Sequence, residues 1–318
     1  MKILVTGGAG FIGSHLVDAL LDKNHQVTCL DDLSTGVLSN IKPHLKNKNF
    51  KFIKASIKDE ALIKKIIPKF DLIYHLAAVV GVTNVIDNPL HGIDINVHAS
   101  SNLIKAIHKA EKILIFASSS ESYGKNKVPQ LKETDDSLFG EPNITRWWYG
   151  IAKLLEEHTI LNYSKLGLKS VIFRFFNFYG PRSQNPIYSN VIPKFIKQAL
   201  KNEPLTVYGN GQQIRSFTYI KDAINTLLKV LETPKAYGEV INLGRVEAVS
   251  ILDLAKKIIK LTNSKSKIIF TKNNPNFEES TQRIPNNKKL METLGITPKV
   301  TLNQGLQQTI EWFRLQKI

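Results

Sequence analysis

The sequence contains little cysteine, little arginine and no long apolar run. Cys29 is the single cysteine among 318 residues, which excludes an internal disulfide and a cysteine-based zinc site and fits a reducing compartment. No apolar run approaches the roughly 18 residues that a membrane helix needs, and the amino terminus leads straight into glycines without forming a signal peptide. We therefore expect a cytoplasmic protein with no membrane partner, in which Cys29 is a small buried hydrophobe.

Arginine is scarce although the chain is strongly basic. The net charge is +16, yet only seven of the 43 cationic side chains are Arg and 36 are Lys. A nucleic-acid-binding protein would carry a basic stripe interleaved with exposed aromatic residues. Here the lysines recur singly or in pairs on the faces of expected helices, which predicts solvation and no nucleic-acid partner. The few arginines mark positions where a planar, forked cation is useful, above all for phosphate groups.

Short apolar runs alternate with helical patterns in the first half of the chain. The hydrophobic content of 42% and the charged content of 22% indicate a globular protein. Strands are expected at 2–7, 26–32, 50–56, 71–78, 112–120 and 170–177, and helices at 11–23, 89–109 and 146–165. Nearly continuous apolar strands predict an α/β protein whose parallel sheet is covered by helices on both faces. We place a boundary near residue 180, and the strand-like segment 239–244 is able to return to the first sheet.

A glycine turn follows the first expected strand and opens the first expected helix. Gly7, Gly10 and Gly13 form a G-x-x-G-x-x-G pattern. Small residues let the backbone approach a pyrophosphate, and the helix amino terminus offers free N–H groups to it. The second strand ends in Asp31 and Asp32, where a carboxylate accepts the ribose hydroxyls of NAD and repels the 2′-phosphate of NADP. These residues together predict an NAD site.

A Y-x-x-x-K pattern and a serine-rich strand end provide candidate catalytic groups. Tyr149 and Lys153 lie on one face of an expected helix, about 6 Å apart at Cβ. A nearby ammonium would lower the pKa of the phenol and make Tyr149 a general base. Ser119, Ser120 and Glu121 follow the fifth strand at its carboxyl end, where open α/β sheets bind their ligands.

These motifs, together with HLAA at 75–78 and INV at 95–97, resemble the extended short-chain dehydrogenase/reductase superfamily and its NAD-dependent nucleotide-sugar epimerase/dehydratase family. The resemblance implies a Rossmann-like, doubly wound parallel sheet at 1–179 and a smaller carboxyl-terminal α/β substrate-binding domain at 180–318. It implies that NAD is bound by Gly7, Gly10, Phe11, Ile12, Gly13, Asp31, Asp32, Ser56, Ile57, Leu76, Ala77, Ala78, Asn96, Tyr149 and Lys153. Ser56 stands where the family usually has an aspartate, which puts its contact with adenine in doubt.

The resemblance also implies a reaction that begins by oxidising C4 of a sugar. In that reaction Tyr149 takes the O4 proton, Lys153 holds the phenolate and the nicotinamide ribose, and Ser119 orients the sugar hydroxyl. The S-S-E triplet resembles the T-S-E of GDP-mannose 4,6-dehydratases and of UDP-glucuronate-type decarboxylases. Because Glu121 would then remove the C5 proton, we favour a 4,6-dehydratase. A UDP-sugar 4-epimerase and a decarboxylase are the alternatives, and a non-catalytic NAD-binding regulator is a remote one, which the intact catalytic set disfavours.

Five arginines fall at positions of resemblance, which favours a phosphate-rich substrate. Arg146 precedes Tyr149, and the others are Arg174, Arg182, Arg215 and Arg283. The substrate-binding residues that the resemblance implies are Ser120, Asn177, Arg182, Val191, Arg215 and Arg283. The expected partner is a nucleotide-diphosphate sugar, with UDP favoured, and no metal is expected. The family also implies a homodimer that pairs the helix of Tyr149 with the helix at about 90–110.

Overall fold

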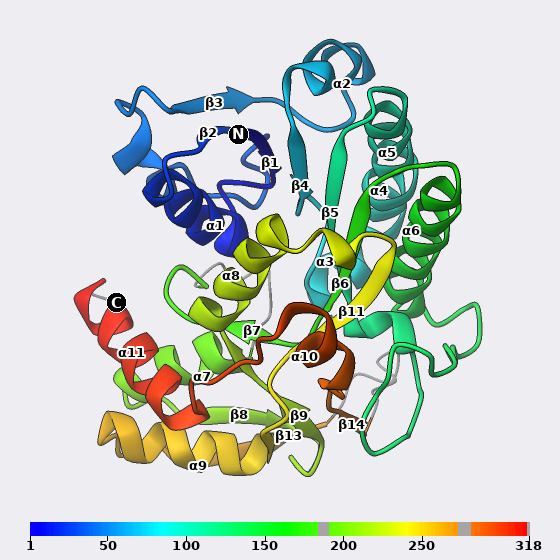
Figure 1. The fold of residues 1–318 in the computed structure, drawn as a ribbon. Helices are drawn as coiled ribbons and strands as arrows, with labels where there is room; N and C mark the ends of the chain where they lie inside the picture. Colours follow the sequence, from blue (N-terminus) through cyan, green and yellow to red (C-terminus); the bar gives the residue numbers. More distant parts are fainter. Residues whose placement is uncertain (184–190, 273–280, 317–318) are drawn as a thin grey trace.

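The computed structural model describes residues 1–183, 191–272 and 281–316 (Figure 1). Its centre is a sheet of seven strands in the order β11-β6-β5-β4-β1-β2-β3, and every neighbouring pair is parallel. The strands are β1 (Lys2–Thr6), β2 (Gln26–Asp31), β3 (Phe50–Lys54), β4 (Leu72–His75), β5 (Ile113–Ser119), β6 (Ser170–Phe175) and β11 (Glu239–Leu243). The chain places β2 and β3 on one side of β1 and then returns to add β4, β5, β6 and β11 on the other side. The predicted doubly wound, Rossmann-like fold is therefore confirmed.

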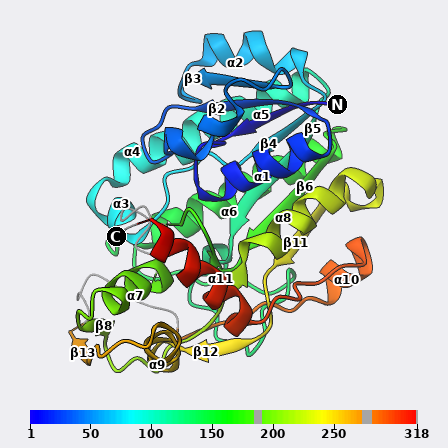
Figure 2. The same ribbon diagram turned by 90° about the vertical axis from the view of Figure 1, so that its left-hand side faces the viewer.

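Helices cover both faces of this sheet. Ile3 and Val5 of β1 pack into one hydrophobic cluster and Leu4 into another, because successive strand residues point to opposite faces. Figures 1 and 2 show α1 (Phe11–Asp22) and α8 (Ile220–Lys229) on one face, and α2 (Glu60–Ile66), α5 (Ser100–Lys109) and α6 (Trp147–Lys165) on the other. Burial on both faces explains why the strands read as nearly continuous apolar runs.

The helix expected at 89–109 is divided into three joined pieces. They are α4 (Pro89–Ile93), the π-helical η4 (Asp94–Ala99) and α5, preceded by α3 (Val82–Asp87). Short 3₁₀ turns connect other elements: η1 (Leu38–Asn40), η2 (Lys42–His44), η3 (Ile67–Lys69), η5 (Ser120–Tyr123), η7 (Val230–Glu232) and η8 (Pro234–Ala236). The π-helical stretch carries Asn96 of the INV motif, so the wider turn falls at a segment that the sequence singled out.

The second half of the chain forms a smaller α/β lobe, drawn in the lower part of Figure 2. Its helices are α7 (Val191–Leu200), α9 (Ile251–Thr262), α10 (Lys288–Leu294) and α11 (Leu302–Leu315). Its small sheets join β7 (Phe178–Tyr179) to β10 (Thr218–Tyr219), β8 (Leu205–Tyr208) to β13 (Ile268–Thr271), and β9 (Ile214–Ser216) to both β12 (Ala248–Ser250) and β14 (Gln282–Arg283). Two later segments, α8 and β11, pack on or pair within the main sheet, so the chain crosses the boundary near 180 three times.

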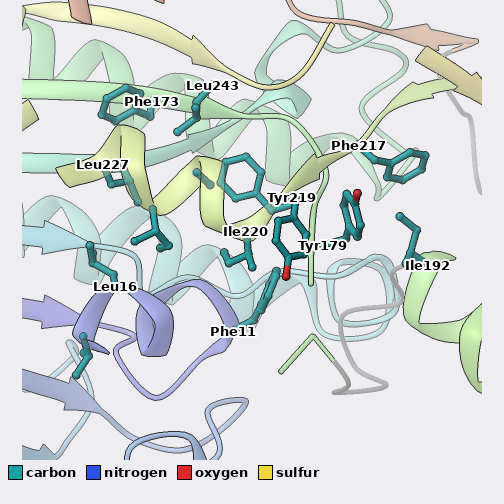
Figure 3. Packing of buried hydrophobic residues seen from close by; sticks show 14 of the residues in the cluster. Phe11, Leu16, Phe173, Tyr179, Ile192, Phe217, Tyr219, Ile220, Leu227 and Leu243 are labelled. Carbon is teal, nitrogen blue, oxygen red and sulfur yellow. The ribbon is translucent and has the colours of Figure 1, made fainter. Parts of the chain in front are cut away.

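One hydrophobic core joins the two lobes. Figure 3 shows Phe11 of α1 beside Ile220 of α8, and Tyr179 and Phe217 continue the cluster toward Ile192 of the smaller lobe. All five side chains are at most 8% exposed. The glycine turn before Phe11 and the smaller lobe are therefore held in one packed body.

The burial of the cations separates lysine from arginine. Among the residues that the structure describes, the buried cations are Lys153, Arg146, Arg174, Arg215 and Arg283. Among these described residues, one lysine of 35 but four arginines of seven therefore lie inside the protein. Cys29 is buried in β2, and burial raises the pKa of its thiol well above the ordinary range. No helix in the described ranges combines the length and apolar character that crossing a bilayer requires.

Candidate active site

The glycine turn has the close backbone packing that a pyrophosphate site needs. Gly7 has φ +71°, and a Cβ at Gly13 would lie 2.1 Å from the carbonyl oxygen of Gly7. Gly10 is the N-cap of α1, and no side chain caps this helix. The helix begins at Phe11, followed by Ile12, so its first N–H groups point out of the turn toward the space a phosphate would take. The backbone here fits the diphosphate of NAD.

Asp31 lies against this turn at the carboxyl end of β2. Its Oδ2 accepts a hydrogen bond from Ala9 N and its Oδ1 accepts one from Leu33 N, both at 2.9 Å. Burial raises the pKa of Asp31, and these two backbone hydrogen bonds oppose the shift. Asp32 instead caps the following turn through Ser34 N. The structure therefore brings Asp31, more than Asp32, to the place where the sequence predicts the adenosine ribose.

The other expected cofactor residues occupy the ends of β3 and β4. Ser56 and the buried Ile57 follow β3, and Ser56 Oγ accepts a weak hydrogen bond from Lys58 N at 3.4 Å. Leu76, Ala77 and Ala78 follow β4, and Ala77 lies so close to Gly7 that a Cβ there would meet Ala77 N at 2.8 Å. Asn96 pairs its side-chain amide with Val79 N and O at 2.8 and 2.9 Å. It braces this segment, and direct contact with the cofactor stays a prediction.

Ser119 and Tyr149 meet at the carboxyl end of β5. Ser119 ends the strand and caps η5 by accepting a hydrogen bond from Glu121 N at 3.1 Å. Tyr149 lies in the first turn of α6. Burial raises the pKa of its phenol, and a hydrogen bond with Ser119 opposes the shift. The two groups that the sequence proposed for handling the O4 proton are thus in contact.

Lys153 lies one helical turn after Tyr149 and pairs with a carboxylate of its own helix. We expected its ammonium to lower the pKa of the phenol, but burial raises that pKa. Lys153 Nζ instead lies 2.9 Å from Glu156 Oε2. The effect of Lys153 on Tyr149 stays a prediction, and the spacing argument left out the carboxylate one helical turn beyond Lys153.

Glu121 is bound by two arginines from distant parts of the chain, and a third arginine also lowers its pKa. Arg146 Nη2 donates to both of its carboxylate oxygens at 3.1 and 3.2 Å, and Arg283 Nη1 donates to Oε1. Arg215 of β9 lies in register with Arg283 of β14. Burial disfavours the charged form of Glu121, but Arg146 and Arg283 outweigh it and lower its pKa to about 2. A carboxylate with so low a pKa is a weak general base, so the role expected of Glu121 at C5 is not supported.

This ion cluster predicts how stability changes in acid. A depressed folded-state pKa gives stability that is present above the ordinary value of 4.5 and is lost as the pH falls toward about 2; the shift corresponds to on the order of 3 kcal/mol. Wild-type protein should therefore lose more unfolding free energy than Glu121→Gln between about pH 6 and about pH 3. Urea unfolding of both proteins at the two pH values measures the difference, and parallel losses would contradict the assignment.

The remaining predicted substrate residues do not join this cluster. Arg174 pairs with the buried Glu157, and Arg182 Nη2 lies 2.8 Å from Asp18 Oδ2 on α1. Asn177 Nδ2 donates to Ser216 O at 3.0 Å. Ser120 is buried within η5 and Val191 begins α7. Of the five arginines, the structure thus brings together Arg146, Arg215 and Arg283, while Arg174 is structural and Arg182 ties the segment after β7 to α1.

Sequence reasoning missed two buried groups near Lys153. Glu156 lies three residues after Lys153, so helical spacing alone places the two on one face. His75 was treated as part of the HLAA motif, yet it is 1% exposed and hydrogen-bonded at both ring nitrogens. In the part of the chain that the structure describes, no group of three or more His, Cys, Asp or Glu side chains is placed to hold a metal ion.

Comparisons with known proteins agree with this geometry. The profile of the NAD dependent epimerase/dehydratase family matches residues 3–244. A UDP-N-acetyl-alpha-D-glucosaminuronate decarboxylase of Bacillus cytotoxicus is 41% identical over 317 residues, covering 98% of each chain. The solved UDP-glucuronic acid 4-epimerase of Bacillus cereus, in complex with UDP-glucuronic acid and NAD, has a TM-score of 0.90 at 33% identity and covers 99% of this chain and 100% of its own.

A more distant structure represents the dehydratases. The dTDP-glucose 4,6-dehydratase of Bacillus anthracis, in complex with NAD, has a TM-score of 0.87 at 27% identity over 100% of this chain and 97% of its own. The B. cytotoxicus decarboxylase and the B. cereus epimerase are therefore more similar to the chain than this dehydratase is. The chain belongs to the NAD-dependent epimerase/dehydratase family, and it is an enzyme that uses NAD.

Proposed function

We propose that this enzyme is a decarboxylase of a UDP-linked uronic acid, with UDP-N-acetylglucosaminuronate as the favoured substrate. The observation that carries the proposal is the arginine cluster at Glu121. Arg146 and Arg283 bind the Glu121 carboxylate, and Arg215 lies in register with Arg283 and also lowers the pKa of Glu121, so three guanidinium groups gather near Ser119. Guanidinium groups bind carboxylates through charge-assisted hydrogen bonds, which a uronic acid is able to accept and a neutral hexose is not. The decarboxylase relative at 41% identity supports the same choice.

The chemistry begins at O4 of the sugar. Tyr149 takes the O4 proton, Ser119 hydrogen-bonds the same region, and Lys153 supplies a positive charge one helical turn away. NAD, when bound at the glycine turn and Asp31, supplies the acceptor for the C4 hydride and later returns it. Oxidation at C4 makes the uronic acid a β-keto acid, whose C5 carboxylate lies next to the new carbonyl.

Loss of carbon dioxide then needs no base at C5. The bond from C5 to the carboxyl carbon breaks, its electron pair enters the C4–C5 enolate, and C5 takes a proton. Return of the hydride to C4, with return of the proton from Tyr149 to O4, gives a UDP-linked pentose derivative, so the reaction has no net oxidation. Elimination of water across C5–C6, as in a 4,6-dehydratase, would instead need a carboxylate free to remove the C5 proton. Glu121, held by Arg146 and Arg283 with a pKa of about 2, is unsuited to that task.

A panel of sugar nucleotides tests this assignment. Incubation with UDP-N-acetylglucosaminuronate and with UDP-glucuronate, followed by mass spectrometry, should show loss of the mass of carbon dioxide. UDP-glucose, GDP-mannose and dTDP-glucose should not lose the mass of water. Loss of water from any of these hexoses, with no decarboxylation of the uronates, would overturn the proposal.

A UDP-uronate 4-epimerase is the second candidate, because the B. cereus epimerase superposes on this chain with a TM-score of 0.90. It would bind the same anionic sugar and perform the same oxidation, but the keto sugar would rotate and take the hydride on its other face. The same panel separates the two reactions. Epimerisation gives a product of unchanged mass with a new retention time.

We also propose that the enzyme is a cytoplasmic homodimer. Ile151 and Leu155 of α6 are 47% and 49% exposed, and Leu90 of the neighbouring α4 is 81% exposed. These are the helices that the family resemblance assigns to subunit pairing, and a second copy would cover their apolar side chains. Sedimentation at micromolar concentration should give the mass of two chains, whereas Ile151→Glu should shift the protein toward the mass of one.

A further inference from the structure

Lys153 and Glu156 form an ion pair inside the protein. Lys153 Nζ lies 2.9 Å from Glu156 Oε2, and each side chain is 3% exposed. The ammonium also lies 4.6 Å from the centroid of the Phe116 ring. Burying both charges costs several kcal/mol per ion, by the order of magnitude known for such pairs. A salt bridge on the surface does not have this cost, because water solvates both charges. The glutamate at this buried position therefore has a reason other than solubility.

A chain of buried hydroxyl and imidazole groups leads to Glu156 from the glycine turn. Thr6 Oγ1 lies 2.8 Å from His75 Nδ1, and His75 Nε2 lies 3.0 Å from Ser100 Oγ. Ser100 in turn acts on the Glu156 carboxylate and lowers its pKa. Thr6, His75 and Ser100 are each at most 1% exposed. Residues of β1, β4 and α5 thus form a buried polar chain that leads toward Glu156.

The charges around Glu156 make it the counterion of Lys153. Burial lowers the pKa of His75 to about 3, and the charge of Lys153 acts in the same direction, so the imidazole is neutral. Glu157, the next residue, is held by Arg174 through three hydrogen bonds. Ser100 is uncharged, and Phe116 offers only its ring face. The remaining charged group that acts on Tyr149 from another element is Glu121, which Arg146 and Arg283 neutralise.

We propose that Glu156 is a positioning residue that anchors the Lys153 ammonium and offsets its charge, so that Tyr149 stays protonated until cofactor and substrate arrive. The inference rests on the roles of Tyr149 and Lys153 in the proposed function. Burial raises the pKa of Glu156, and the Lys153 ammonium beside it opposes this shift by favouring the charged form. In that form, its charge raises the pKa of Tyr149. Removing this charge leaves the ammonium uncompensated near the phenol and makes the phenolate easier to form.

The test is a titration of Tyr149 that needs no substrate. Phenolate absorbance is followed against pH in NAD-saturated Glu156→Gln, and the curve of the Glu156→Gln/Tyr149→Phe double variant is subtracted to isolate Tyr149. The same subtraction is made in the wild-type background. We expect the midpoint in Glu156→Gln to lie lower by about one pH unit or more. The acid limb of kcat against pH should move in the same direction with a uronate substrate.

Two further variants guard against a purely structural effect. Ser100→Ala removes a hydroxyl that lowers the pKa of Glu156 and so favours its charged form, and it should shift the midpoint the same way by a smaller amount even if Glu156→Gln does not fold. Glu232→Gln, in an exposed pair with Lys229, should leave the midpoint unchanged. Coincident midpoints in wild type, Glu156→Gln and Ser100→Ala would overturn the inference. Failure to convert a uronate would instead count against the proposed function, because the titration does not depend on turnover.

Discussion

Tyr149→Phe is expected to lower kcat by about 10²–10⁴-fold, the range for loss of a positioned general base. Phenylalanine keeps the ring but removes the hydroxyl that meets Ser119. The O4 proton then has no acceptor, so the C4 hydride does not transfer and NADH does not appear when substrate is added. Stopped-flow absorbance of NADH and steady-state product formation both measure the loss.

The controls for this variant are its melting temperature and its binding of NAD. Tyr149 has part of its surface exposed in the first turn of α6, so removal of one hydroxyl should change the melting temperature little. Binding of NAD, followed by quenching of tryptophan fluorescence, should match wild type. Ser119→Ala should lie between the two proteins, because it removes the partner of the phenol and leaves the base. A Tyr149→Phe enzyme that formed NADH at more than about a tenth of the wild-type rate would contradict the assignment of the base.

Glu157→Gln is expected to lower the free energy of unfolding by about 3–5 kcal/mol, the cost of breaking a buried charge pair. Arg174 donates three hydrogen bonds to the Glu157 carboxylate at 2.7 to 3.1 Å, and Ser118 Oγ donates a fourth. The side chains of Arg174 and Glu157 are 7% and 2% exposed. An amide would leave the guanidinium without a counterion in a place that water does not reach.

An exposed glutamate provides the matched comparison. Glu232 pairs with Lys229 at 3.1 Å, but these side chains are 60% and 43% exposed. Glu232→Gln should therefore change stability by less than about 1 kcal/mol. Chemical denaturation of both variants at neutral pH compares the two pairs directly. Equal losses would mean that burial of the Arg174 pair does not set its contribution.

The fold followed from local signals because each strand and helix carries its own pattern. The glycine turn, the Y-x-x-x-K helix and the apolar strands all depend on residues close together in the chain, and their elements begin and end within a few residues of the predicted bounds. The sequence indicated that the segment 239–244 is able to return to the first sheet, but it did not predict the pairing of β11 with β6. A parallel edge pairing between residues about 70 apart leaves no mark on the residues between them.

The candidate site was harder to predict, because its electrostatics depend on distant residues. Spacing alone placed Tyr149 near Lys153 on one helix, but the pKa of the phenol depends on burial and on Ser119 of β5. Glu121 looked like a free base in the sequence. In the structure, Arg283, 162 residues away, donates a hydrogen bond to this carboxylate. The sequence indicated that the few arginines bind anionic groups, but it did not show that the anionic group of Arg174 is the buried Glu157 of the same chain.

The most direct test of the account uses UDP-N-acetylglucosaminuronate carrying deuterium at C4, incubated with the NAD-loaded enzyme in ordinary water without added cofactor. Mass spectrometry and NMR of the product should show loss of carbon dioxide, deuterium retained at C4 and a new solvent-derived hydrogen at C5. That pattern requires a hydride that leaves C4 and returns within one active site, with decarboxylation between the two transfers. A product that keeps its carboxyl group, or one that has lost the C4 deuterium to solvent, would contradict the account.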